Sequence, residues 1–67
     1  MDRQVKMTLP QIYRLEKGDQ IVRKDGGTVC SVMLMDLRGE RVKIFDARAT
    51  SVFWCVFGTL MKNWKVK

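Results

Sequence analysis

The chain has 67 residues, enough for one domain with a thin core, because a domain of this size buries only roughly 60% of the surface that its unfolded chain exposes. Thirteen Lys and Arg against seven Asp and Glu give a formal net charge of +6, and histidine is absent. This composition excludes histidine-based catalysis and histidine-ligated zinc. The basic excess favours a polyanionic partner, because each neutralised phosphate releases condensed counterions. A basic surface that serves only solubility is the alternative.

The N-terminal part of the chain predicts a short helix. We expect residues 1–7 to be flexible, and Thr8 can then cap a helix, with Gln11 completing a capping box three residues later. Gly18 suits the position after a helix end, so the helix is expected over residues 8–17. No apolar stretch of secretory or membrane-spanning length is present. We therefore expect a cytoplasmic protein without contact to a membrane.

Strand signals follow from Gly18 onward. The turn Asp25-Gly26-Gly27 is a strong hairpin signal, and Gly39 marks a second turn. In the strand that follows, Val42 and Ile44 share one face, which predicts a half-buried strand with a basic opposite face. The strands expected are 19–24, 28–37, 41–46, 52–57 and a short one over 59–61.

These elements predict a single mainly β domain over residues 1–67. We expect a small SH3-like or Sm-like barrel of four to five strands over residues 18–61, preceded by the helix and followed by a basic tail, 62–67. A fragment of a β-sandwich and an open meander with the helix on one face are the alternatives.

The two cysteines, Cys30 and Cys55, are too few for a tetrahedral zinc site. In a cytoplasmic protein we expect both to be buried free thiols, since a free cysteine behaves as a small apolar residue. A disulfide between them is the alternative. We expect no metal and no cofactor, which leaves oligomerisation as the means of stabilising so small a domain.

The apolar run 52–57 offers large side chains to both faces of a strand. Val52, Trp54 and Val56 point one way, and the residues between them point the other way. One set fills the interior, and the other must contact the helix or a second subunit. The set expected at an oligomer interface is Phe53, Cys55 and Phe57.

Candidate catalytic residues are lacking. The seven acidic residues fall mostly at turns and strand ends, where solvated carboxylates are common, and no pair has a spacing typical of catalysis. The cysteines have no histidine to serve as a base, and no glycine-rich phosphate loop is present. We therefore expect a protein that is not an enzyme.

Basic residues beside aromatic ones suggest a surface for nucleic acid. Bases stack on aromatic rings, and phosphates contact ammonium or guanidinium groups. Phe45 next to Lys43 and Trp64 between two lysines fit this pattern, although a solvated strand face and a core plug are the structural alternatives. The residues expected to bind nucleic acid are Arg23, Lys24, Arg41, Lys43, Phe45, Lys62, Trp64 and Lys65.

The segment 18–27, GDQIVRKDGG, resembles the G-D-x-V-x-x-K-x-G-G opening of small SH3-like and KOW-like barrel proteins of bacteria and phages. The segment 42–46 is similar to the central strand of those barrels. For KOW-like and Sm-like relatives the resemblance implies binding of RNA or DNA. Other proteins of this shape bind proteins, so the rival function is a module, such as a phage-encoded modulator, that binds an acidic surface of a host protein.

The opening is also similar to that of the plasmid-type dihydrofolate reductase, which works through a tetrameric pore. The pore segment of that family is V-Q-I-Y, and Val42-Lys43-Ile44-Phe45 departs from it at the second and fourth positions. A pore-forming oligomeric reductase is accordingly the third functional hypothesis.

Overall fold

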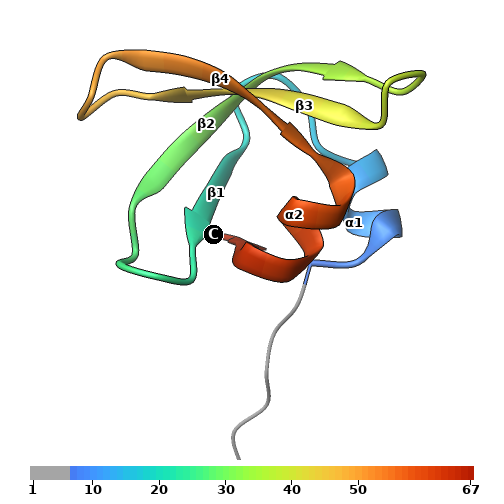
Figure 1. Ribbon diagram of the computed structural model, residues 1–67, viewed down its shortest axis with the longest axis horizontal. Coiled ribbons are helices and arrows are strands. Elements are labelled where there is room, and N and C mark those ends of the chain that lie inside the picture. The colour runs from blue at the N-terminus through green and yellow to red at the C-terminus, as the bar shows by residue number, and fades with distance from the viewer. Residues whose placement is uncertain (1–6) are drawn as a thin grey trace, which may run out of the picture.

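The computed structural model describes residues 7–67, which form one five-stranded antiparallel sheet and two short helices (Figure 1). The strand order β4-β3-β2-β1-β5 makes a meander of the first four strands, and the last strand returns to pair with the first. Figure 1 shows the sheet bending around its interior, with α1 and α2 close together on one side. The mainly β prediction is confirmed. The elements are α1 (Leu9–Tyr13), β1 (Gln20–Arg23), β2 (Val29–Asp36), β3 (Arg41–Asp46), β4 (Ser51–Val56), α2 (Phe57–Asn63) and β5 (Trp64–Val66).

The N-terminal helix starts as predicted but is shorter. The Thr8 hydroxyl accepts a hydrogen bond from the Gln11 amide, and the Gln11 side chain accepts one from the Thr8 amide at 2.9 Å. The expected helix over 8–17 is wrong beyond Tyr13. The Asp19 carboxylate accepts the Glu16 amide at 2.9 Å, and the Asp19 amide donates to the Glu16 carbonyl. This closed turn gives the backbone an alternative to continuing the helix.

Both predicted hairpin turns are present, and the strands beside them match the sequence closely. Gly26 and Gly27 have φ values of +96° and +69°, which residues with a Cβ rarely adopt. The third strand has the predicted bounds, Arg41–Asp46, with Val42 and Ile44 wholly buried. Its regular alternation allowed both bounds and faces to be predicted.

The C-terminal part of the chain differs from the prediction. The expected strand over 59–61 is the middle of α2, and the expected basic tail 62–67 contains β5. Leu60 is wholly buried, which anchors α2 to the core, and β5 pairs with β1. The alternation of apolar and basic residues in the tail is a strand pattern of period two, and a free edge on β1 accepts it.

The interior is a single cluster of apolar side chains. Met7 is 1% exposed, so the flexibility expected for residues 1–7 is wrong at Met7, and residues 1–6 lie outside the described part of the chain. Cys30 and Cys55 are buried free thiols, as predicted, and burial raises the pKa of both. The cluster consists of Met7, Ile12, Leu15, Ile21, Cys30, Val32, Val42, Ile44, Cys55, Phe57, Leu60 and Trp64.

The inward side of β4 and the start of α2 correct the expected oligomer interface. Cys55 and Phe57 belong to the core, and Phe53 packs against it. These three side chains help to fill the interior and are not free to contact a second subunit. The opposite set, Val52 and the alternate residues after it, remains exposed.

Gly58 provides a test of α2. A Cβ added at Gly58 has no atom within 4 Å, so we expect Gly58→Ala to raise the free energy of unfolding by about 0.5–1 kcal/mol through the greater helix propensity of alanine. Urea denaturation followed by circular dichroism measures the change. Gly26→Ala is the control, because the φ of +96° there predicts destabilisation. A destabilised Gly58→Ala protein would contradict the helix.

Candidate functional site

Strands β2, β3 and β4 carry large side chains on the side of the sheet that faces away from the core, which we call the outer face. Because Val42 and Ile44 are buried, the alternate residues of β3 point outward. The cross-strand register extends this face to both neighbouring strands. Its rows are Ser31 with Phe45 and Val52, Leu34 with Lys43 and Trp54, and Asp36 with Arg41 and Val56.

Trp54 lies at the centre of the β4 part of this face and is 39% exposed. The guanidinium carbon of Arg41 lies 4.1 Å from the centroid of its ring, and Nζ of Lys43 lies 5.8 Å from it. Both distances are within the range of cation–π attraction. The result is an aromatic surface with two cations held against it.

Asp36 holds Arg41 in this position. Its Oδ2 accepts Nε of Arg41 at 3.0 Å, and its Oδ1 accepts the Gly39 amide at 3.0 Å. The hydrogen bond from the Gly39 backbone and the one from Arg41 lower the pKa of the Asp36 carboxyl. Arg41 is therefore fixed at Nε, while its side chain stays 44% exposed and has further donors for a ligand.

The expected nucleic-acid-binding residues fall into two groups. Arg41, Lys43 and Phe45 share the outer face of β3, with Phe45 half-buried. The other basic residues lie beside or in β1 and β5, which β2 separates from β3, and in α2. They are Arg23 and Lys24 at the end of β1, Lys62 in the last turn of α2, and Lys65 in β5.

Trp64 is a correction to the expected site. Its side chain is 3% exposed and belongs to the core, with the ring of Phe53 at a centroid distance of 6.4 Å. The guanidinium of Arg23 lies 5.6 Å from its ring centroid. Trp64 therefore fills the interior and offers no platform for a base. The structural alternative for this residue, a core plug, is the right one.

Sequence reasoning missed Trp54 as a binding residue. The run 52–57 is apolar on both faces, so alternation alone does not say which set points outward. The signal lies in a non-local pair: Trp54 is directly opposite Lys43 in the register of β3 and β4. A cation opposite an aromatic residue in a hairpin indicates a shared solvent-facing side.

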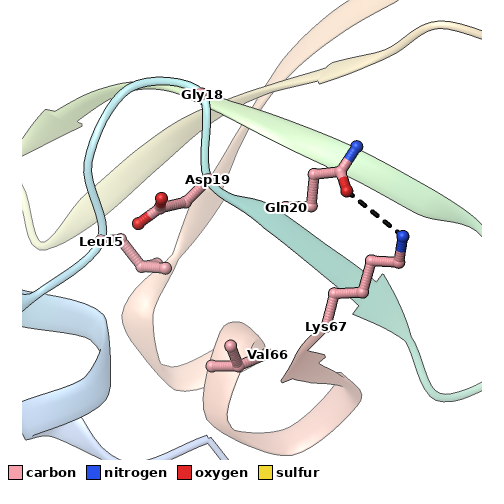
Figure 2. Close-up of a pocket in the computed structure, with 6 residues that line it drawn as sticks. All are labelled: Leu15, Gly18, Asp19, Gln20, Val66 and Lys67. Carbon is pink, nitrogen blue, oxygen red and sulfur yellow. Dashed lines mark hydrogen bonds between the residues drawn. The ribbon is translucent and has the colours of Figure 1, made fainter.

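A second feature is an open hollow of about 650 Å³ between β1, β5 and the loop after α1 (Figure 2). It is lined by Leu15, Gly18, Asp19, Gln20, Val66 and Lys67. Figure 2 shows Nζ of Lys67 donating to the Gln20 amide oxygen, at 3.3 Å. The one carboxylate, that of Asp19, already accepts a backbone amide. The Lys67 ammonium, the Gln20 amide oxygen and the Asp19 carboxylate are thus engaged within the protein.

Comparison of the chain with protein-family models, with curated proteins and with solved structures finds no match. Within residues 7–67, no helix has the length and apolar character needed to cross a bilayer. The same residues contain no cluster of three or more His, Cys, Asp or Glu that could hold a metal ion. The outer face is therefore the part of the described chain whose chemistry points to a function.

Asp36 makes the stability of the fold depend on pH. Because its pKa is lowered in the folded protein, ionised Asp36 stabilises the fold fully above its ordinary pKa of 3.8, and the effect is lost as the pH falls through the lower folded value. We expect Asp36→Asn to reduce the free energy of unfolding at pH 6, with the difference from wild type shrinking below pH 3.8. Urea denaturation across this pH range measures it. Asp25→Asn, an equal change of charge in a turn, is the control.

A substitution at Gly39 provides a second test of the ion pair between Asp36 and Arg41, because this glycine lies close to both side chains. A Cβ at this position would lie 2.6 Å from Oδ2 of Asp36 and 3.2 Å from Nε of Arg41. Because the Asp36 carboxylate can move, we expect Gly39→Ala to break the ion pair without unfolding the protein, and to raise the pKa of Asp36 toward its ordinary value. Titration of the carboxyl by NMR measures the shift. An unchanged titration would contradict the described contact.

Proposed function

We propose that this protein binds single-stranded nucleic acid, RNA or DNA, through the outer face, mainly by contacts to the backbone. The observation that carries the proposal is the exposed ring of Trp54 with Arg41 and Lys43 held against it. Phosphates pair with the two cations, and an unpaired base stacks on the exposed surface of the Trp54 ring and the Arg41 guanidinium plane that lies against it. The net charge of +6 supports a polyanionic ligand.

The geometry favours single strands over duplexes. A base can stack on an aromatic side chain only when its own face is free, and in a duplex that face is covered by the neighbouring pairs. The apolar side chains around Trp54, namely Leu34, Val52 and Val56, are each about half exposed and can contact further bases or sugars. Lys65 in β5 extends the positive charge to the far edge of the sheet.

We propose an SH3-like barrel as the finer description of the fold. The strand order β4-β3-β2-β1-β5 and the short helix between β4 and β5 support it. The resemblance of the GDQIVRKDGG segment to the opening of SH3-like and KOW-like barrels agrees with this arrangement. The two buried free thiols support a reducing, cytoplasmic location.

A protein-binding module is the second candidate, and one observation favours it. Leu34, Leu37 and Val56 are 54%, 62% and 52% exposed, so the outer face and its β2–β3 turn present more apolar surface than phosphate contacts need. Binding through such contacts depends weakly on salt. Binding to phosphates weakens steeply as salt rises.

Replacing Trp54 tests the stacking contact. We expect Trp54→Ala to weaken the binding of a labelled single-stranded oligonucleotide by about 1–3 kcal/mol, roughly 5- to 150-fold, because a base loses its stacking partner. Trp54→Phe keeps an aromatic ring and should recover part of the affinity. Fluorescence anisotropy at two salt concentrations measures both. Tyr13→Ala removes an exposed aromatic side chain of α1 and should have no effect.

Replacing the two cations tests the phosphate contacts. In the double variant Arg41→Ala/Lys43→Ala, the slope of log K against log salt should fall by about 1.4 in magnitude, since each single-strand phosphate contact contributes about 0.7. Arg14→Ala/Lys17→Ala removes the same charge outside the outer face and should leave the slope nearly unchanged. Equal effects of the two double variants would mean that net charge alone drives binding. No binding to RNA or DNA at low salt would overturn the proposal.

A further inference from the structure

Strand β4 is an edge strand with no protection against pairing. It pairs with β3 on one side, and no strand within residues 7–67 pairs with its other side. Its six residues, SVFWCV, include no proline and no charged residue, and its register with β3 has no bulge. The opposite edge strand, β5, is three residues long, contains the exposed Lys65 and is followed by the exposed Lys67. Short edges and lysines are common means of preventing strand addition, and β4 has neither.

The backbone pattern shows which groups of β4 are free. The Phe57 amide donates to the Glu40 carbonyl at 2.8 Å, and this pair continues the register in which Val56 lies opposite Arg41. In an antiparallel ladder, hydrogen-bonded and non-hydrogen-bonded pairs alternate. Phe53 and Cys55 therefore bond to β3, while the N–H and C=O groups of Val52 and Trp54 and the N–H of Val56 point to the open edge. The Val56 carbonyl is engaged within the protein, because Val56 is the N-cap of α2 and its oxygen also accepts the Cys55 thiol.

The residues with free backbone groups are also those with exposed side chains. Val52, Trp54 and Val56 are 47%, 39% and 52% exposed. They are arranged symmetrically, with a valine two residues before Trp54 and another two residues after it. An antiparallel copy of this strand centred on Trp54 would place Val52 opposite Val56 at both ends.

We propose that two copies of this protein pair through β4 in antiparallel orientation, about a two-fold axis at Trp54. The Trp54 pair then exchanges two N–H···O bonds, and in each of the two outer pairs the Val56 amide donates to the Val52 carbonyl of the other copy. The two five-stranded sheets become continuous, and these four bonds use only backbone groups that are free in the monomer. This pairing is independent of the proposed nucleic-acid binding, although it would join the two outer faces into one surface.

A second copy fits this edge better than an unrelated strand. A strand with valines at equal distances from a central tryptophan is complementary to itself, as a two-fold interface requires. The paired β4 strands carry no charged residue. The nearest cations of the outer face, Arg41 and Lys43, lie on β3 and contact Trp54 of the same copy. Because each copy has a net charge of +6, we expect added salt to strengthen the pairing.

Val56→Pro tests the proposal with little risk to the fold. The φ of Val56 is −73°, within the range of proline, and its amide is not used in the ladder with β3. Val56→Thr keeps the amide and the β-branched shape and serves as the matched control. Sedimentation equilibrium of the nucleic-acid-free proteins should show a concentration-dependent dimer for wild type and Val56→Thr, with at least a tenfold weaker dimer for Val56→Pro. Circular dichroism checks that each variant is folded.

Hydrogen exchange of wild-type amides gives an independent measurement. The amides of Trp54 and Val56 should exchange slowly only at concentrations where the dimer forms, whereas those of Phe53 and Cys55 should be protected at every concentration. A wild-type protein that is monomeric at all concentrations overturns the proposal. A dimer in which the Trp54 and Val56 amides exchange freely, or one that Val56→Pro leaves unchanged, overturns it equally.

Discussion

The burial of Val42 and Ile44 is the constraint on which the rest of the structure depends. Both side chains are wholly buried, so the other face of β3 must point to solvent, and the ladders on either side extend this choice to β2 and β4. A shift of β3 by one residue in its register would bury Lys43 and expose the core side chains Val42 and Ile44. The position of Trp54 opposite Lys43 is thus a consequence of how the small interior is filled.

The sequence predicted features whose causes are local. The capping box at Thr8, the Asp25-Gly26-Gly27 turn and the bounds of β3 each depend on residues within a few positions, and all are present. Features that depend on distant contacts were predicted less well. The structure of the C-terminal segment depends on the free edge of β1, which is distant in the sequence. The end of α1 is an exception, because the turn between Glu16 and Asp19 that follows it is local and was still not predicted.

The roles of the two tryptophans also depend on contacts that are distant in the sequence. Trp64 alternates with lysines and Trp54 lies in an apolar run, so local pattern favours Trp64 as the exposed ring. The structure reverses this, because β5 returns to β1 and directs Trp64 into the interior beside Phe53. Half of the candidate site, Arg41, Lys43 and Phe45, could be read from alternation in β3. Its aromatic centre could not, since that needs the register of β3 and β4.

Chemical modification of the two buried thiols can report on transient opening of the sheet. Cys30 lies in β2 and Cys55 in β4, and burial raises the pKa of each, so the reactive thiolate is scarce in the closed fold. An alkylating reagent can then modify either residue only when the strand around it separates from the core. The two alkylation rates would separately measure how often the middle and the edge of the sheet come apart.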